Sequence, residues 1–348
     1  MMRHKFKARQ ARYMAAAAIV AVMVPVTVLG GLALGSVKYS APDTLSCFLG
    51  SCQDRVMEDI VWKIRAPRTL AALMGGAGLA TAGALLQALF RNPLASPSIL
   101  GISSGASLGV ALLVIGGISI GIPVHAFGVQ SVFVAAFAGA LATMFVIMAI
   151  IPRATNTTTL LLVGLMINAL LLSIIGILAV MAQAADLQVF YTWTLGSFAG
   201  ITWDMLNYLY IIVPLAIAGS YAMSKSLDAS LLGEGYAASI GVKAGQLRNR
   251  AVLLSSALTS TITAIAGPVG FIGIAGPYLA RLMSHSGMHR VIIPLSAVIG
   301  GLLTAGADIL ARIVIPPVDL PTSSITSIIG APLVIMILLK RKGEGLSQ

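Results

Sequence analysis

The sequence predicts an all-α polytopic membrane protein with about ten transmembrane helices, and three observations carry that prediction. Of its 348 residues, 58% are hydrophobic and only 9% are charged, whereas a soluble domain carries roughly 25% charged residues. The apolar residues gather in repeated runs of about 20 residues, the length of a helix that spans a bilayer. The 36 glycines agree, since small residues let membrane helices approach one another closely.

Ten apolar stretches fit such spans, within one transmembrane domain over residues 1–348. The eighth stretch is too short to cross the hydrocarbon at 1.5 Å per residue. The first resembles a signal peptide, but its apolar run is too long and no A-x-A-like site follows, so we expect a retained span. The expected limits are 13–35, 66–90, 96–116, 127–151, 157–182, 203–223, 250–266, 277–286, 290–311 and 324–340.

The basic residues predict the orientation. With the N-terminus inside, 16 of the 22 Lys and Arg residues fall in inner segments, which is the bias that cytoplasmic loops show. Both termini and residues 225–250 are then expected in the cytoplasm, and the loops 36–62, 183–202 and 312–323 outside. Because these loops account for the positive net charge, it does not indicate a nucleic-acid partner.

Two cysteines, Cys47 and Cys52, lie in the first outer loop. An oxidising exterior permits a small disulfide between them, and two unpaired thiols are the alternative. No His/Cys cluster has the spacing of a zinc site. We therefore expect this chain to bind no metal or other cofactor of its own.

The longest hydrophilic interruption of the chain is residues 225–250. It is too long for a tight turn and too short for a domain. Its centre, residues 230–242, fits one short helix with four apolar side chains on a common side. Those side chains are Leu231, Leu232, Tyr236 and Ile240.

The sequence lacks the motifs of an energy-converting or catalytic centre. No G-x-x-x-x-G-K-[ST] motif is present, which excludes ATP hydrolysis by the P-loop route, and no G-x-S-x-G or H-E-x-x-H motif is present either. Asp308 is the one carboxylate well inside an expected span, although ion-coupled carriers usually need intramembrane acids or bases. A transporter driven by another subunit is therefore favoured over a secondary carrier or a membrane-embedded enzyme.

Three arginines are expected at the outer face, which the positive-inside rule depletes of them. Arg65 and Arg68 open the second span, where a cation opposes the helix macrodipole by roughly 0.3–1 kcal/mol. This placement suggests docking of a partner's carboxylates, and pairing with neighbouring acids or lipid phosphate is the alternative. Arg312 follows Asp308 by four residues, so a local ion pair is favoured over a shared basic patch.

Residues 267–277 interrupt the spans with four glycines and two prolines, which cannot form a regular helix. Irregular backbone at membrane depth is tolerated only where protein or a water-filled cavity covers it, so the segment either flanks a pathway or makes a packing turn. Polar residues inside spans either line a passage or hold helices together. The pathway candidates are Asn168, Gly267, Pro268, Gly270 and Gly273.

Several motifs in order resemble the permease subunits of type II ABC importers for ferric siderophores, haem and vitamin B12. They are R-A-P-R-T-L at 65–70, L-L-Q-A-L-F-R-N-P-L-A-S-P at 85–97, L-G-S-F-A-G at 195–200, G-P-V-G-F-I-G-I-A-G-P-Y-L-A-R-L at 267–282 and A-D-I-L-A-R at 307–312. The resemblance covers nearly the whole chain. It departs at Tyr278, where the family commonly has histidine, so no metal-type role carries over to that position.

The resemblance implies a complex in the bacterial cytoplasmic membrane with a second permease copy, two ATPase subunits that use ATP-Mg, and a periplasmic or lipid-anchored binding protein. It implies docking of that protein by Arg65, Arg68 and Arg312, and an ATPase-coupling role for residues 225–250. The implied substrate is an iron chelate, with haem or a corrinoid as the alternative. The expected coupling residues are Leu231, Leu232, Gly233, Glu234, Tyr236, Ile240 and Gly241.

Overall fold

The computed structural model describes residues 22–37, 39–48, 50–52, 54–116, 129–153 and 157–344, and these residues form helices without a strand. Each of the ten expected spans overlaps a helix, although residues 13–21 of the first lie outside the described residues. Within the described chain, five helices are long and apolar enough to cross a membrane. Three shorter apolar helices accompany them, at Val22–Ala33, Ile102–Gly116 and Thr322–Ile335.

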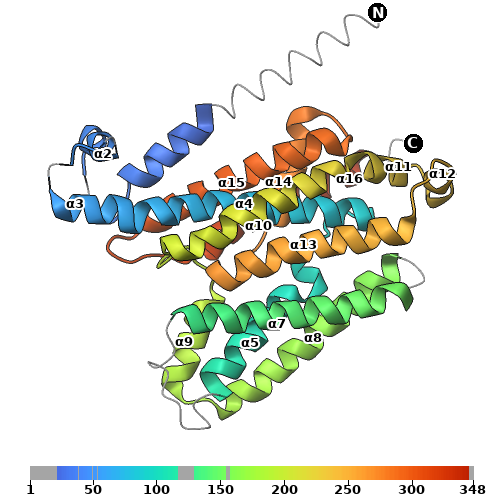
Figure 1. Ribbon diagram of the computed structural model, residues 1–348, viewed down its shortest axis with the longest axis horizontal. Helices are drawn as coiled ribbons and strands as arrows, with labels where there is room; N and C mark the ends of the chain where they lie inside the picture. The colour runs from blue at the N-terminus through green and yellow to red at the C-terminus, as the bar shows by residue number, and fades with distance from the viewer. Residues whose placement is uncertain are drawn as a thin grey trace, which may run out of the picture.

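The centre of the molecule is a pair of long helices, α4 (Ala66–Phe90) and α15 (His289–Ile313), which lie side by side (Figure 1). A Cβ atom added to Gly76 would lie 2.2 Å from the carbonyl oxygen of Gly300, and one added to Gly300 would lie 2.4 Å from that of Gly76. The two backbones therefore touch directly, because neither position carries a side chain.

Three further helices pack around this pair. They are α10 (Trp203–Ala222), α13 (Ala244–Ala266) and α14 (Ile272–Ser284). The second expected span begins earlier than predicted. α3 (Arg55–Asp59) and a π-helical stretch, Ile60–Arg65, form one continuous helix with α4. The predicted outer loop 36–62 is thus partly helical.

A second group of helices lies along α13 (Figure 1). It consists of α5 (Ile102–Ala111), α7 (Val129–Ile150), α8 (Thr157–Met181) and α9 (Ala184–Thr194). Here too glycine permits close contact, since a Cβ atom on Gly109 would lie 2.0 Å from the carbonyl oxygen of Ala135. The apolar cluster between these helices reaches α13 at Val252 and Ala264.

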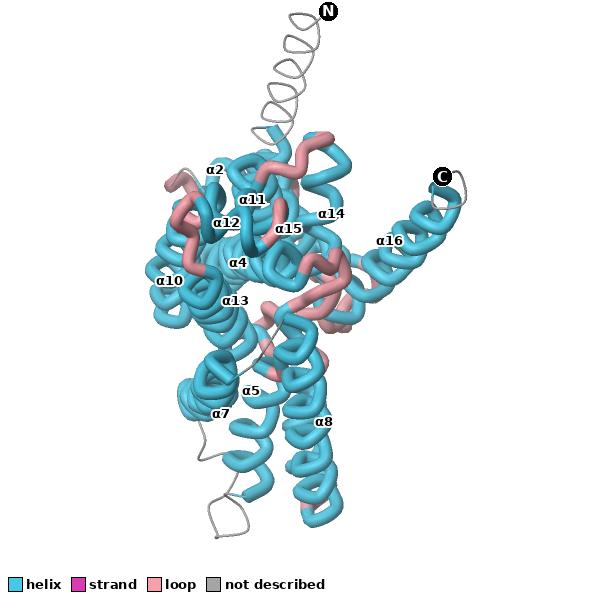
Figure 2. The backbone as a smooth tube through the Cα atoms, turned by 90° about the vertical axis from the view of Figure 1, so that its right-hand side faces the viewer, coloured by secondary structure: helices cyan, strands magenta, loops and turns pink. Residues whose placement is uncertain are grey.

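The last helix, α16 (Thr322–Glu344), projects from the rest of the bundle (Figure 2). Its apolar side chains Ile328, Ile329 and Ile335 are exposed. The outer face of α8 is also uncovered, with Leu170 and Ile177 among its exposed residues. These apolar faces are thus left to lipid or to another protein.

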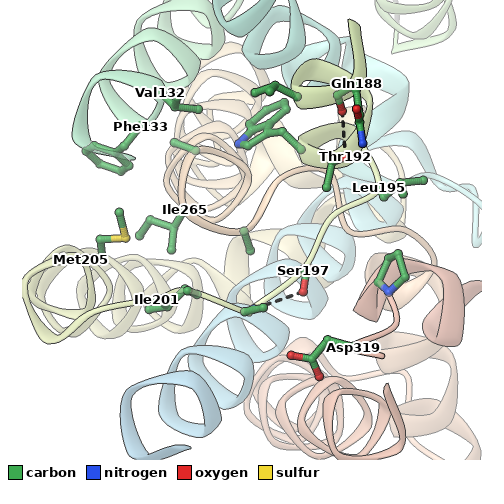
Figure 3. Close-up of a pocket in the computed structure, with 17 residues that line it drawn as sticks. Val132, Phe133, Gln188, Thr192, Leu195, Ser197, Ile201, Met205, Ile265 and Asp319 are labelled. Carbon is green, nitrogen blue, oxygen red and sulfur yellow. Dashed lines mark hydrogen bonds between the residues drawn. The ribbon is translucent and has the colours of Figure 1, made fainter. Parts of the chain in front are cut away.

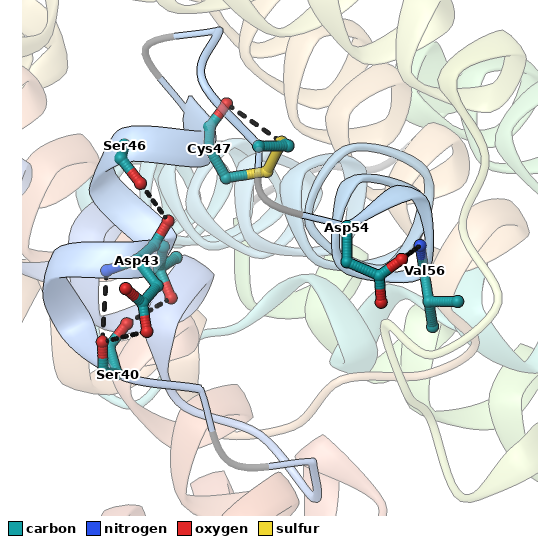
Figure 4. Close-up of a disulfide and its surroundings, with 8 residues drawn as sticks. Ser40, Asp43, Ser46, Cys47, Asp54 and Val56 are labelled. Atoms are coloured by element: carbon teal, nitrogen blue, oxygen red, sulfur yellow. Dashed lines mark hydrogen bonds between the residues drawn. A yellow bond between two sulfur atoms is a disulfide. The ribbon is translucent and has the colours of Figure 1, made fainter.

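The two ends of the bundle differ in character. At one end, Cys47 of α2 (Ala41–Phe48) forms a disulfide with Cys52 (Figure 4), so the paired alternative is confirmed. Nearby, the Phe48 and Trp62 rings stack with centroids 5.2 Å apart. We call this the disulfide end. The other end carries two short helices, α11 (Ser224–Leu231) and α12 (Glu234–Ser239), and we call it the α11–α12 end.

One predicted loop and one predicted span differ from the structure. The predicted loop 183–202 contains α9, a helix of 11 residues, which a search for apolar runs of membrane length passes over. The predicted third span is divided, because Gly101 has a φ of 75° and separates the short 3-10 helix Pro97–Leu100 from α5. A left-handed residue ends a helix.

The predicted irregular segment 267–277 is also shorter than expected. α14 begins at Ile272 and contains Pro277, which has no N–H for the carbonyl of Gly273. That carbonyl instead accepts a hydrogen bond from Gln87 Nε2 at 3.3 Å. A neighbouring helix therefore supplies the donor that proline removes, and the segment is helical where local sequence disfavours it.

The α4–α15 contact gives a first prediction. Gly300→Ala places a methyl group against the α4 backbone and should destabilise the protein by about 1–3 kcal/mol, the usual cost of overpacking. The matched control is Gly306→Ala on the same helix, where a Cβ atom meets nothing within 4 Å. Thermal unfolding in detergent should show a lower midpoint for the first variant only; equal midpoints would contradict the close packing.

Candidate functional site

Residues 225–250 contain two short helices and the first turns of α13, not the single helix expected over 230–242. α11 and α12 are separated at Gly233, which has a φ of 115°. Only glycine adopts this conformation without strain, so that expectation was wrong. Gly241, with a φ of 87°, follows α12, and Lys243 precedes the start of α13.

The apolar side chains expected to couple this segment to a partner are exposed. Clustered exposed apolar side chains mark a surface for interaction. The buried side of α11 is anchored by Leu227, which packs in a cluster with Leu85 and Ile293. The exposed fractions are 44% for Leu231, 69% for Leu232, 51% for Tyr236 and 55% for Ile240.

Arg68 and Arg312, at the disulfide end, are buried and share one carboxylate. Arg68 Nε lies 2.9 Å from Asp308 Oδ1, and Arg312 Nη2 lies 2.7 Å from Asp308 Oδ2. Arg68 Nη1 also lies 2.8 Å from Asp319 Oδ2. Two cations are thus balanced by two anions, as buried charges require. The local Asp308–Arg312 ion pair expected from the sequence is confirmed.

Arg65 has a different environment. It is buried and donates from its guanidinium to carbonyl oxygens at the end of the helix Val22–Ala33, where the last carbonyls have no donor within the helix. Asp59, one of its expected alternative partners, pairs with Lys63 instead, at 2.7 Å. The acceptors of Arg65 are Leu32, Ala33 and Val37. The docking role of the three arginines stays a prediction.

The break between α13 and α14 is covered by other segments of the chain. Ser197 N donates to the carbonyl of Ala266 at 2.8 Å. Gly270 N donates to Ser323 Oγ at 3.3 Å, and Thr326 Oγ1 donates to the carbonyl of Gly270 at 3.2 Å. Covered irregular backbone of this kind is a packing junction. A pathway role for Gly267, Pro268, Gly270 and Gly273 stays a prediction.

Asn168 joins two helices of the second group. Its side-chain oxygen accepts a hydrogen bond from Ser104 Oγ, which links α8 to α5. This contact favours the helix-joining alternative. Asn168 is nevertheless partly exposed, so its role as a pathway residue stays a prediction.

A pocket of about 560 Å³ opens at the disulfide end, beside the break (Figure 3). Most of its wall is apolar and comes from several helices, with Phe133 on α7, Trp193 on α9 and Met205 on α10. Asp319 contributes a carboxylate to the wall. That carboxylate forms an ion pair with Arg68, which does not line the pocket. The buried charge network therefore reaches a solvent-accessible opening.

The sequence model of the FecCD transport family matches residues 21–340 of the chain. The chain belongs to the FecCD transport family. It is 34% identical over 285 residues to the vitamin B12 import system permease protein BtuC of Klebsiella pneumoniae, covering 82% of this chain and 84% of BtuC. It is 35% identical over 320 residues to the hemin transport system permease protein HmuU of Yersinia pestis, covering 90% and 93%.

The fold is that of a type II ABC importer permease. A solved structure described as an inward-facing metal-chelate type ABC transporter matches with a TM-score of 0.81 and 27% sequence identity. The match covers 92% of this chain and 97% of that one. This FecCD-family chain is therefore a multi-pass membrane permease, as its composition and motifs predicted.

Sequence reasoning missed the acidic partners that distant segments supply to Arg68 and His289. Asp319 was assigned only to an outer loop, and its contact with Arg68 joins residues 251 positions apart. The contact of Asp228 with His289 joins residues 61 positions apart and has no signal in a single sequence. Helix packing alone brings such residues together.

The charge network gives a second prediction. Asp308→Asn leaves two buried arginines without their shared anion and should destabilise the protein by about 3–5 kcal/mol. Asp59→Asn removes an exposed ion pair with Lys63, worth about 0–1 kcal/mol, and serves as the matched control. Thermal unfolding should separate the two variants clearly. Similar midpoints would mean that Asp308 does not neutralise Arg68 and Arg312.

Proposed function

We propose that this FecCD-family permease moves an iron chelate across the cytoplasmic membrane, driven by ATPase subunits that bind α11 and α12. The observation that carries the proposal is the exposed apolar surface of Leu231, Leu232, Tyr236 and Ile240 on a segment that is otherwise hydrophilic. Because the chain has no P-loop motif and few carboxylates inside its spans, energy supplied by a partner is favoured, and exposed apolar side chains suit binding to one.

The substrate class rests on the relatives. The solved neighbour is described as a metal-chelate type ABC transporter, which supports an iron chelate. The relatives HmuU and BtuC are named for import of hemin and of vitamin B12. Haem or a corrinoid is therefore the second candidate substrate. All three are large metal complexes, and the small and apolar residues of the bundle do not distinguish among them.

The excess of Lys and Arg in the segments around α11 and α12 supports a cytoplasmic position for that end. The disulfide end then faces the oxidising exterior, where the Cys47–Cys52 bond persists. We place docking of a substrate-binding protein at this end. Arg68 Nη2 is buried without an acceptor among the described residues, and the half-exposed Asp319 is the acid that an incoming carboxylate would replace.

A second permease copy is the partner proposed for the uncovered faces of α8 and α16. Both faces are apolar and exposed, and α16 projects from the bundle as a helix with a missing neighbour would (Figure 2). Lipid covers the remaining apolar perimeter. A pathway between two copies would pass α8, which carries Asn168.

Loss of the ATPase contact is the third prediction. Leu232→Asp and Tyr236→Asp place a charge where an apolar interface is proposed, and each should abolish co-purification of the ATPase subunits with the permease. Val56→Asp is the matched control, since Val56 is 60% exposed at the opposite end. Retention of the ATPase subunits by both α11–α12 variants would contradict the proposed contact of α11 and α12 with the ATPase.

Transport itself is the fourth prediction. In proteoliposomes, the permease with its ATPase and binding protein should take up a ferric siderophore when ATP is present on the ATPase side. The permease alone should not. Uptake by the chain without an ATPase would point to a secondary carrier, and ATP-dependent uptake of haem or cobalamin alone would select the second candidate substrate.

A further inference from the structure

The carboxylate of Asp228 connects α11 to His289, the first residue of α15. Asp228 Oδ1 accepts a hydrogen bond from the backbone N–H of His289 at 2.8 Å and lies 2.6 Å from His289 Nδ1. The first N–H groups of a helix have no partner within it, and Met288, the residue before α15, provides no side-chain cap. Asp228 therefore caps α15 from another helix, where its negative charge also suits the helix dipole.

α11 is also tied to the last turn of α4. Arg91, which follows α4 and has a φ of 47°, donates from Nη2 to the carbonyl oxygen of Ser230 at 2.6 Å. That carbonyl lies in the last turn of α11, where a cation is favourable. Next to Asp228 in the chain, Leu227 is fully buried in an apolar cluster with residues of α4 and α15.

The two helices that α11 contacts form one unit along the molecule. Gly76 and Gly300 bring their backbones together in the middle. At the far end, the Arg68–Asp308 ion pair joins them again. A displacement of α11 must therefore carry both helices with it, or break the contact at Asp228.

These contacts lead to an inference that rests on the proposed function. We propose that Asp228 is a positioning residue that passes movement of the α11–α12 segment to the α4–α15 pair and so to the disulfide end. Asp228 touches neither substrate nor nucleotide. It fixes where α15 begins relative to the segment that the ATPase contacts.

The test measures substrate moved per ATP hydrolysed in the complete reconstituted complex. Asp228→Ala should lower this ratio by about tenfold, the factor that corresponds to one charge-assisted hydrogen bond, while ATP hydrolysis continues. Asp228→Asn keeps an acceptor for the backbone N–H of His289 and should give an intermediate ratio. Asp204→Ala, at an exposed acid in the first turn of α10, is the control and should leave the ratio unchanged.

The outcomes separate this inference from the proposed function. If the unaltered complex shows no ATP-dependent uptake, the proposed function fails first. If that complex transports and the Asp228 variants keep its ratio, the inference is overturned. Variants that lose uptake and hydrolysis in equal proportion would also overturn it, since Asp228 would then only stabilise the fold. Should Asp228→Ala not assemble, Asp228→Asn decides on the same ratio.

Discussion

The structure depends on direct backbone contact between α4 and α15. At Gly76 and Gly300 the two helices approach so closely that neither position accommodates a Cβ atom. In a bilayer the hydrophobic effect does not drive helices together, so contact of this kind and interhelical hydrogen bonds hold the bundle. The same pair is closed at one end by Arg68 and Asp308 and at the other by its contacts with α11.

These polar contacts explain how buried charged side chains are tolerated in a largely apolar chain. The buried arginines have partners on other elements: Arg68 has two carboxylates, Arg65 has the carbonyls that end the helix Val22–Ala33, and Arg312 has the carbonyl of Gly31. Gln87 has a comparable role without charge, because it donates to the carbonyl freed by Pro277 and accepts from Arg281. Polar groups here join helices at the places where regular helical bonding stops.

The sequence predicted the features that depend on local pattern. The ranges expected for the fifth and sixth spans match α8 and α10 within about a residue, because apolar length determines them. The Asp308–Arg312 pair follows from spacing on one helix. The split at Gly233 was missed because the apolar spacing over 230–242 also fits one helix. Arg65, Asp319 and Asp228 were not assigned their partners, since those contacts join distant segments that only packing brings together.

We infer that α11, α4 and α15 move as one unit when the proposed ATPase acts. This joint movement is tested most directly by spin-label distances in complexes with one labelled permease copy. Labels at Lys225 of α11 and Leu310 near the far end of α15 are both at exposed positions, and about 32 Å of α15 lies between His289 and Leu310 at 1.5 Å per residue. If the three helices move together, the distance is the same in the nucleotide-free and ATP-trapped complexes. A change of several ångströms between the two states would contradict joint movement.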